Sequence, residues 1–369
     1  MTLEEKLSLI KQVGEEIVTE EDLKELLKSD EQLIAYDGFE PSGQMHIAQG
    51  ILRTININKM TKAGIKFKMW VADWHALTNN KLGGDLNKIK TVGKYFIEVW
   101  KACGMDLENV EFHWASDMVK NPDYWQLVIN VGRTNKLARF IRTAEFMGRE
   151  ESAEKLTAAQ IIYPCMQIAD IFMLGAKITQ LGMDQRKVNM LAREIGPQLG
   201  YWKPVVVSHH MLMSLATPPK SDSDKTSRMI ELKMSKSNPE YAVFMTDTTE
   251  YIKRKINKAW APEGVIEENP VLEYCKYIIF PILDDPTSYK LQATSFDINR
   301  PAKWGGPMKI TSYDELIKKY AAKEIHPQDL KNTVAALLDK LVEPVRKHFE
   351  ENEVAKKLLE TVQSYKVTR

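Results

Sequence analysis

Apolar and polar residues form blocks along the first half of the chain that predict strands and helices in turn. Short apolar runs bounded by turn residues are typical of buried strands. They lie at residues 32–39, 65–72, 110–114, 177–182 and 204–208. Apolar residues with a helical period lie at residues 3–28, 45–62 and 84–102, and another helix starts within 184–191. Strand and helix in this rhythm predict an α/β fold with a parallel sheet and crossover helices.

The remaining segments divide the chain further. Residues 121–158 are polar and helical without a strand pattern, so we interpret them as an insertion between two halves of the sheet. Residues 217–238 are rich in Pro, Ser, Asp and Lys, which predicts a mobile loop. After about residue 240 Lys, Glu and Leu dominate in a helical pattern. We therefore predict an N-terminal helical segment (1–30), an α/β domain (31–240) and a mostly α-helical domain (241–369).

Composition excludes some classes of protein and leaves others open. No run of eighteen apolar residues occurs, and the N-terminus lacks an apolar signal core, so we expect neither a membrane span nor secretion. The three cysteines are far apart and form no Cys-x-x-Cys pair, so we expect no bound structural metal and a cytoplasmic location. The net charge of +1 neither requires nor excludes a nucleic-acid partner. We interpret local basic clusters such as 253–258 as solvated helix faces rather than as binding patches.

One polar face stands out in an otherwise apolar stretch. Tyr163, Gln167 and Asp170 have the spacing i, i+4 and i+7, which places all three on one side of a predicted helix. The neighbours of Asp170 are apolar, and an acid in such surroundings is either paired or functional. The alternative is a half-buried tyrosine and an ordinary helix-face acid. This face is a candidate binding site for a small polar ligand.

Two further segments are candidates for holding phosphates. His46 follows a Pro-Ser-Gly turn at the start of the predicted helix 45–62, where free backbone N–H groups attract anions. Gly43 allows close approach of the backbone, and Gly50 lies one turn further on. The segment 233–237 offers two ammonium groups and two hydroxyls on the predicted loop, which suits closure over a triphosphate. Each segment alone is common, as a turn before a helix or as a Lys/Ser linker.

Adjacent histidines at 209 and 210 do not predict a metal site. Neighbouring side chains on a strand point to opposite faces of the sheet.

The order of the two phosphate segments carries a resemblance to a known family. His46-Ile47-Ala48-Gln49 resembles the "HIGH" signature of class I aminoacyl-tRNA synthetases, and Lys233-Met234-Ser235-Lys236-Ser237 matches their "KMSKS" signature. Gln49 can donate a hydrogen bond but carries no charge, so His46 alone keeps the role of the signature histidines. The resemblance implies a Rossmann-like catalytic domain that ends in the KMSKS loop, with a helical anticodon-binding domain after it.

The resemblance extends over nearly the whole chain and is closest to tyrosyl-tRNA synthetases of the eukaryotic and archaeal type. It rests on the segments 36–43, 72–76, 163–170 and 182–187. It implies that Tyr36 and Asp170 bind the phenol of tyrosine. It also implies that Tyr163, Gln167 and Gln185 hold the ammonium group. Three further residues of the matching segments belong to the implied tyrosine site: Gly38, Glu40 and His75.

The implied reaction has two steps. The carboxylate of tyrosine attacks the α-phosphate of ATP, and the terminal ribose of tRNA(Tyr) then attacks the adenylate. The carboxylate is already ionised, so the first step rests on positioning and charge stabilisation. The resemblance implies that His46, Lys233 and Lys236 act on the phosphates and that Mg²⁺ accompanies ATP. The other residues implied at the ATP site are Gly43, Gln49, Gly50, Met234, Ser235 and Ser237.

The resemblance also implies contacts with tRNA and with a second copy of the chain. Arg186 corresponds to the residue at the first acceptor-stem pair, and Trp304, His326 and Asp329 lie in segments like those that read the anticodon. The alternative is that Trp304 is core and that Asp329 is an early acid of a helix started by Pro327. A homodimer is expected, with residues 121–158 as its interface.

Three alternatives remain at the level of sequence. The tryptophan-specific relatives share the fold and both signatures, but an indole has no use for a paired Tyr36 and Asp170. A non-catalytic relative that binds tRNA or protein has no need of His46, Lys233 and Lys236. A small-molecule adenylyltransferase of the same superfamily does not need the helical region after residue 240.

Overall fold

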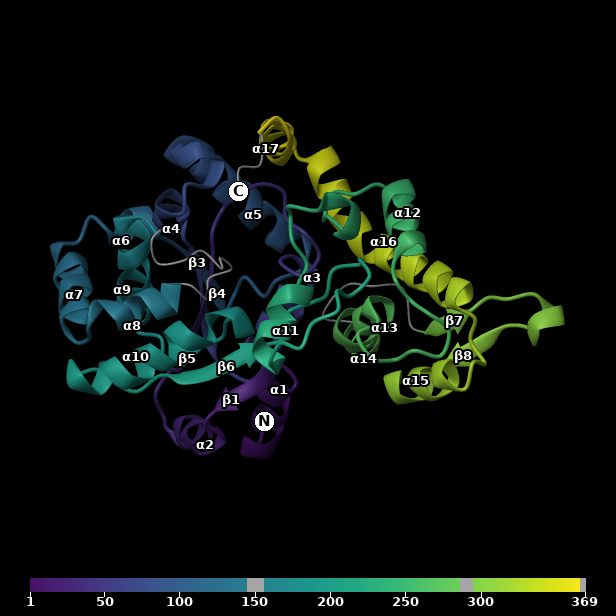
Figure 1. Ribbon diagram of the computed structural model, residues 1–369, viewed down its shortest axis with the longest axis horizontal. Helices are drawn as coiled ribbons and strands as arrows, with labels where there is room; N and C mark the ends of the chain where they lie inside the picture. The colour runs from purple at the N-terminus through teal and green to yellow at the C-terminus, as the bar shows by residue number, and fades with distance from the viewer. Residues whose placement is uncertain (145–155, 286–294, 366–369) are drawn as a thin grey trace.

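The computed structural model describes residues 1–144, 156–285 and 295–365. A six-stranded sheet lies at the centre of the molecule (Figure 1). Its strands are β1 (Gly14–Val18), β2 (Ile34–Phe39), β3 (Lys66–Val71), β4 (Val110–Trp114), β5 (Ile178–Thr179) and β6 (Val205–His209). The spatial order is β1-β6-β5-β2-β3-β4, with β2 to β6 parallel and β1 antiparallel at the edge. The prediction of an α/β fold with a mainly parallel sheet is confirmed.

Helices cover both faces of this sheet, as crossover connections between parallel strands require. The helices of the first 200 residues are α1 (Leu3–Lys11), α2 (Glu20–Lys28), α3 (Ile51–Lys62), α4 (Asp73–Thr78), α5 (Leu86–Ala102), α6 (Ala115–Met118), α7 (Pro122–Arg133), α8 (Leu137–Ala144), α9 (Ala158–Met173) and α10 (Arg186–Gln198). The predicted insertion is helical where it is described, and residues 145–155 of it lie outside the described ranges. On the left of Figure 1, α7 to α10 form a layer of their own.

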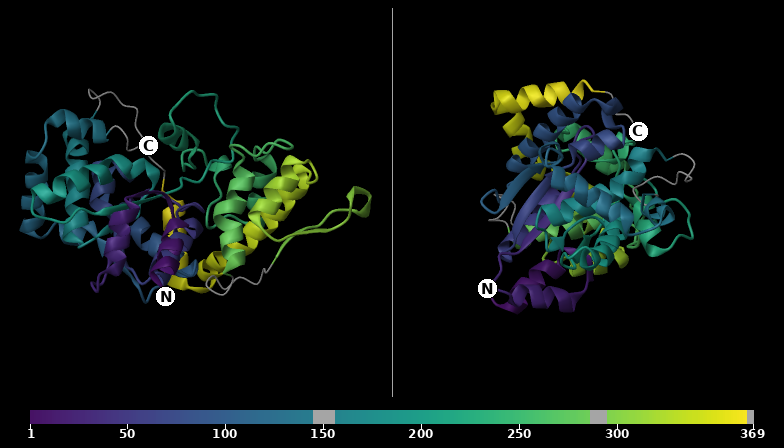
Figure 2. Two further views of the ribbon diagram at one scale, coloured as in Figure 1. Left: turned by 90° about the horizontal axis from the view of Figure 1, so that it is seen from below. Right: turned by 90° about the vertical axis from the view of Figure 1, so that its left-hand side faces the viewer.

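The region after β6 is mostly helical, as predicted. It contains α11 (Lys225–Leu232), α12 (Thr249–Lys258), α13 (Pro270–Tyr274), a π-helical turn (Cys275–Ile279), α14 (Phe280–Asp284), α15 (Tyr313–Ala321), α16 (Pro327–Glu351) and α17 (Glu353–Gln363). A short antiparallel hairpin of β7 (Phe296–Ile298) and β8 (Met308–Ile310) interrupts the helices. Figure 2 shows the ribbon of this hairpin extending away from the helices.

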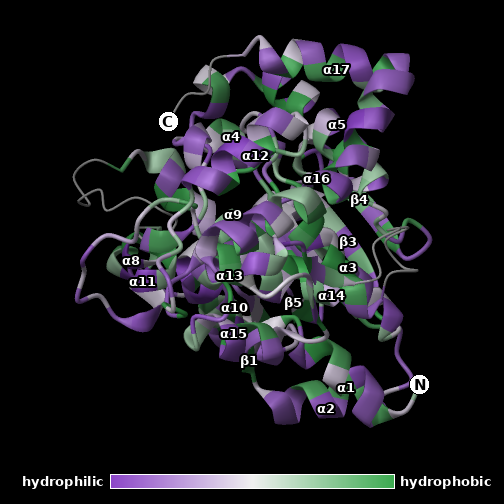
Figure 3. Ribbon diagram, turned by 90° about the vertical axis from the view of Figure 1, so that its right-hand side faces the viewer, coloured by the Kyte–Doolittle hydropathy of each residue, from purple (hydrophilic) through white to green (hydrophobic). Residues whose placement is uncertain are grey.

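The alternation of side chains along the strands creates two cores. Ala35 and Phe39 of β2 pack with α3 and α5, whereas Tyr36 packs with Trp70 and the apolar residues of α9 on the other face. The first core continues into α12 and α16, so apolar packing does not stop at the predicted boundary near residue 240. Figure 3 shows hydrophobic green along the central strands and mixed colours on α1 and α17.

The end of the chain returns to the α/β region. Helix α17 packs on α5, Phe349 of α16 contacts the ring of Tyr95 with centroids 5.4 Å apart, and His348 Nε2 lies 2.8 Å from a carboxylate oxygen of Glu98. Among the described residues, no helix combines the length and the apolar character needed to cross a membrane.

Three local predictions were wrong, each for a physical reason. Residues 3–28 are not all helical, because Gly14–Val18 pairs with β6 as an edge strand. Thr19 accepts a hydrogen bond from the N–H of Asp22 and caps α2. The helix predicted from residue 45 begins only at Ile51. The loop predicted at 217–238 contains α11, whose N-cap is Asp224.

Candidate active site

A pocket of about 290 Å³ opens where the connections of the sheet change direction. From β2 the chain continues to β3 on one side, whereas β5 lies on the other side of β2. In open α/β sheets ligands bind at such a point, beyond the carboxyl ends of the strands. The pocket is lined by residues from the ends of β2, β3, β5 and β6, from α9, and from the loop after α11. Of the predicted site residues, it is lined by Tyr36, Gly38, Glu40, His46, Gln49, His75, Tyr163, Gln167, Asp170, Gln185, Lys233 and Met234.

The inner end of the pocket is built around the buried carboxylate of Asp170. Its Oδ1 accepts a hydrogen bond of 3.0 Å from the Tyr124 hydroxyl, and its Oδ2 lies 2.9 Å from Nε2 of His75. Burial opposes a charge on His75, but the Asp170 carboxylate outweighs it and raises the pKa of the imidazole. The Tyr36 hydroxyl is buried and forms no hydrogen bond of standard geometry within the described residues. Burial, and then the nearby Asp170 charge, raise the pKa of Tyr36 well above its usual value, so it remains a donor. This end therefore offers an acceptor and a donor to one hydroxyl.

The middle of the pocket offers acceptors. Gln167 donates to Gln185 Oε1 over 3.2 Å, and its own Oε1 is buried without a hydrogen bond in the described structure. The Tyr163 hydroxyl donates to Glu40 Oε1 over 2.7 Å, which leaves its oxygen lone pairs available. A carboxylate, an amide oxygen and a phenol oxygen in one pocket suit a ligand ammonium group.

His46 lies in a bridge rather than at a helix N-terminus. It pairs with Phe244 in an isolated β-bridge, and the N–H of Ile47 donates to the carbonyl of Val243 over 2.8 Å. This pairing explains why α3 begins only at Ile51. The free N–H groups of the helix N-terminus, which we expected at His46, therefore lie further along the chain. Burial, followed by the charges of Lys236, Arg53 and Lys233, lowers the pKa of His46 well below its usual value. The imidazole is therefore neutral and can donate only one hydrogen bond.

The two lysines of the segment 233–237 approach the site from the loop after α11. Lys233 Nζ lies 3.1 Å from Asp184 Oδ2. Lys236 Nζ donates to Ser42 Oγ over 3.2 Å and lies 4.8 Å from the centre of the Phe96 ring. Burial, and then the charge of Lys81, lower the pKa of Lys236 to about 7. Both ammonium groups thus flank the Glu40–His46 turn, with Lys236 just outside the pocket lining.

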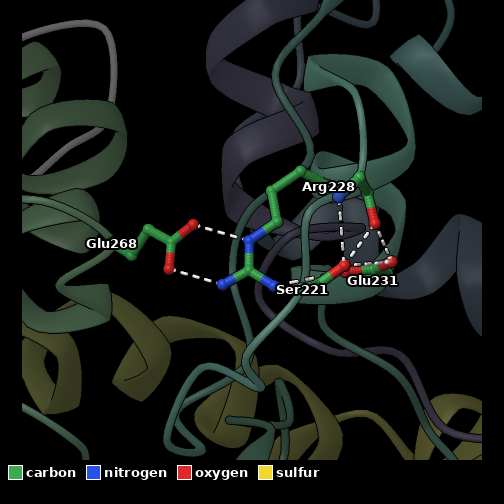
Figure 4. Close-up of polar contacts among 5 residues, drawn as sticks. Ser221, Arg228, Glu231 and Glu268 are labelled. Carbon is green, nitrogen blue, oxygen red and sulfur yellow. Dashed lines mark hydrogen bonds and ion pairs between the residues drawn. The ribbon is translucent and has the colours of Figure 1, made fainter.

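Helix α11, which precedes the loop 233–237, is paired with the C-terminal region. The guanidinium of Arg228 makes a bidentate pair with Glu268, with both contacts at 2.6 Å (Figure 4). A further contact of 3.2 Å joins Arg228 to Glu231, whose carboxylate also accepts from Ser221. The start of the loop is held in place as well. Met213 forms an isolated β-bridge with Lys233, and the N–H of Met213 donates to Glu273 Oε1 over 2.6 Å.

Several residues that line the pocket or contact its lining were not predicted from the sequence. Tyr124 comes from α7, and no motif marks it. Arg53 lies one turn beyond Gln49 and pairs with the buried Asp37 over 3.0 Å, and it also contacts the ring of His209. Burial raises the pKa of Asp37 to about 7 despite Arg53. The position of Arg53, one helical turn after Gln49, was the sequence feature that could have indicated that it belongs to the site.

The remaining predicted ATP residues lie around the pocket rather than in its lining. Gly43 has a φ of 125°, which requires glycine. A Cβ on Gly50 would approach Met245 Sδ to 2.6 Å. Ser235 and Ser237 are exposed, with their hydroxyls 2.8 Å apart.

The predicted tRNA residues lie away from the pocket. Arg186 begins α10 and makes a bidentate pair with Glu16 of β1, at 2.6 and 3.0 Å. His326 caps α16 and accepts from the N–H of Gln328, and Asp329 lies in the first helical turn. The side chain of Trp304 lies outside what the structure describes. Within the described residues, no cluster of three metal-ligating side chains occurs.

Comparisons with known proteins agree with this geometry. Residues 28–343 match the family "tRNA synthetases class I (W and Y)". Tyrosine–tRNA ligase 1, cytoplasmic, of Arabidopsis thaliana is 47% identical and is matched over 100% of this chain and 90% of its own length. Tyrosine–tRNA ligase of Thermococcus kodakarensis is 41% identical over all of both chains. The crystal structure of tyrosyl-tRNA synthetase complexed with L-tyrosine from Pyrococcus horikoshii superposes with a TM-score of 0.88 at 38% identity, covering 98% of this chain and 100% of that one.

Proposed function

The chain belongs to the tyrosyl-tRNA synthetases, class I enzymes that activate tyrosine with ATP and charge tRNA, and on this premise we propose how its own residues carry out the reaction. The observation that carries the proposal is the convergence of Tyr36 and Asp170 at the closed end of one pocket that His46 also lines. In this position Asp170 accepts from the substrate hydroxyl and Tyr36 donates to it. Phenylalanine leaves both groups unpaired, which costs binding free energy.

The ammonium group of tyrosine is held by Gln167, Tyr163 and Gln185. The unpartnered Gln167 Oε1 and the oxygen of Tyr163 are the acceptors, and Gln185 orients the Gln167 amide through their 3.2 Å contact. Glu40 supplies the negative charge nearest to this group. Gly38 packs against Trp70 at the end of β2, and His75 holds Asp170 in place.

The first step joins the tyrosine carboxylate to the α-phosphate of ATP. The carboxylate oxygen forms the new bond, the bond to the β-phosphate oxygen breaks, and pyrophosphate leaves with its charge. His46, Lys233 and Lys236 surround the phosphates and stabilise charge that grows as the bond breaks. ATP is used as its Mg²⁺ complex, so the ion arrives with the substrate. No general base is required.

The flanking positions complete the nucleotide site. Gly43 allows the chain to pass close to the nucleotide, Gly50 leaves room for Met245 beside the nucleotide site, and Gln49 and Met234 line the pocket. Ser235 and Ser237 are exposed on the same loop and reach the phosphates when the loop closes.

In the second step the terminal ribose of tRNA(Tyr) attacks the adenylate. We assign residues 31–240 to catalysis, residues 241–369 to reading the anticodon, and residues 1–30 to an N-terminal helical segment. His326 and Asp329 at the start of α16, with Trp304, are the candidate anticodon contacts. Arg186 contacts the acceptor stem after exchanging Glu16 for a phosphate or base.

The enzyme acts in the cytoplasm as a homodimer. The name of the Arabidopsis relative supports the location. The dimer is supported by large apolar side chains exposed on α7, α8 and α9, namely Ile129, Leu137 and Ile162.

Amino-acid-dependent pyrophosphate exchange tests the assignment of the pocket. The wild-type enzyme should exchange with tyrosine and not with tryptophan or phenylalanine. Asp170→Ala should lower the ratio of tyrosine to phenylalanine activation by at least tenfold, because a charged hydrogen bond contributes about 1.5–3 kcal/mol. An unchanged ratio in a folded variant would refute the assignment, and exchange with tryptophan alone would assign the site to the tryptophan-specific relatives.

A further inference from the structure

A second cavity of about 470 Å³ lies behind the wall of the active-site pocket. Three parts of the chain that are distant in sequence form it: α1, α3, and the π-helical turn with α14. Its volume lies in the range of small-molecule sites, roughly 300–1,000 Å³. Leu52 and His210 line both cavities, so the two cavities share part of a wall.

Helix α3 presents two adjacent donor groups to this second cavity. Asn56 is only 5% exposed, and its side-chain amide makes no hydrogen bond with any described residue. Lys59 lies one helical turn further on, on the same side of the helix. No carboxylate of the described residues lies within ion-pair distance of its ammonium group. By contrast, the amide of Asn58 is fully used, by Gly104 and Asp106.

The charges around the cavity favour an anionic ligand. Burial lowers the pKa of Lys59, and the charges of Asp284 and Asp285 offset this only in part. Asp285 is already paired with Lys62 over 2.8 Å, and Asp284 is exposed to solvent. Lys276 also lines the cavity. A buried donor or ammonium group without a partner costs free energy, and an anion placed between Asn56 and Lys59 removes that cost.

The lining also includes Gln12, Asn58, Lys62, Asp284 and Asp285, and the remainder of it is apolar. The side chains that contribute are Leu9, Val13, Ile55, Tyr277 and Pro281. We propose that this cavity is a binding site for a small organic anion, whose carboxylate, phosphate or sulfonate group lies between Asn56 and Lys59 and whose apolar body packs on these side chains.

His210 connects this site to the catalytic loop. Its ring is stacked on Tyr277 at 4.1 Å, and its Nε2 lies 3.1 Å from Glu273 Oε1. The same Glu273 oxygen accepts a hydrogen bond from the N–H of Met213, and Met213 forms a β-bridge with Lys233. A ligand that contacts His210 therefore acts on the base of the loop that holds Lys233. Such coupling is reciprocal, so ATP changes the affinity of the anion by the same factor as the anion changes that of ATP.

Fluorescence titration with anilinonaphthalene sulfonate, an anion with an apolar body, tests the proposal. The titration is made with tyrosine and a saturating non-hydrolysable ATP analogue, which fill the catalytic pocket, and is repeated with tyrosine alone. We expect one saturable site per chain, with affinity changed at least twofold by the ATP analogue. Lys59→Met should weaken binding at least tenfold, and Asn56→Leu should weaken it severalfold. Lys94→Met, which removes an exposed lysine of α5, is the matched control.

The outcomes separate this site from the catalytic one. Pyrophosphate exchange should be retained in Lys59→Met, so failure of the anion site and failure of the proposed function are distinguishable. Thermal unfolding confirms that each variant is folded. The absence of saturable binding, its loss when the catalytic pocket is filled, or equal weakening by Lys94→Met would each overturn the proposal. An affinity that the ATP analogue leaves unchanged would overturn the link through His210.

Discussion

At the scale of single residues, the chemistry of the inner end of the pocket depends on Asp170 and three neighbouring side chains. These three side chains differ in what they contact. Tyr124 and His75 fix the orientation of the carboxylate, at 3.0 and 2.9 Å, and Tyr36 lines the pocket beside it. We therefore expect the hydroxyl of Tyr124 to support tyrosine binding through Asp170 without touching the reacting atoms.

Tyr124→Phe should raise KM for tyrosine about tenfold with little change in kcat, because losing one hydrogen bond to a charged group costs about 1.5 kcal/mol. Steady-state pyrophosphate exchange measures both constants. Tyr320→Phe is the control, since the buried hydroxyl of Tyr320 binds the carbonyls of Ala261 and Pro262 in the C-terminal region. A rise in KM of the same size in the control would show a general loss of stability instead.

Lys236 should give the reaction a pH dependence near neutrality. Its pKa is lowered to about 7, so the free enzyme carries the charge below that pH and loses it above. Because the role proposed for Lys236 on the phosphates requires its charged form, kcat/KM for ATP should fall as pH rises through about 7. Lys236→Arg keeps its charge at all these pH values and should flatten this limb of the profile. A wild-type profile without the fall, measured by rapid mixing, would contradict the role assigned to Lys236.

At the scale of helices and strands, local pattern predicted the parallel strands and most helices, but not features decided by distant partners. The spacing of Tyr163, Gln167 and Asp170 is local to one helix, so the sequence revealed it. The start of α3 depends on Phe244, about two hundred residues away, and the pairing of β1 depends on β6. Likewise, Tyr124 reaches Asp170 only through packing of α7 on α9. Tertiary contacts override local propensity in each case.

Two helical glycines should respond to alanine in opposite directions. In α10, a Cβ on Gly196 would lie 2.4 Å from the backbone oxygen of Trp202, whereas in α7 a Cβ on Gly132 would lie 3.8 Å from Cys165 Sγ. Gly196→Ala should destabilise the protein by about 1–3 kcal/mol through overpacking. Gly132→Ala should stabilise it by up to about 1 kcal/mol, since alanine favours helix. Thermal unfolding midpoints that move in the same direction for both variants would show that the space around each Cβ does not decide the sign.

At the scale of the whole molecule, the exposed apolar side chains of α7 to α9 predict how two chains associate. Ile129 is 61% exposed on α7, and Ile129→Asp places a charge in the proposed interface. We expect the wild type to sediment as a dimer and the variant to sediment as a monomer at the same concentration. Val354→Asp is the control, because Val354 is 71% exposed on α17, on another part of the surface. A dimer of unchanged strength in Ile129→Asp would exclude this face as the interface.

The sheet is completed by a strand that the ribosome makes first. Residues Gly14–Val18 find their partners only when Val205–His209 has been synthesised. At translation speeds of 5–20 residues per second, this delay is roughly ten to forty seconds. During that interval the nascent chain carries an unpaired edge segment, and we expect the charges of Glu15 and Glu16 to slow its aggregation until β6 has been made.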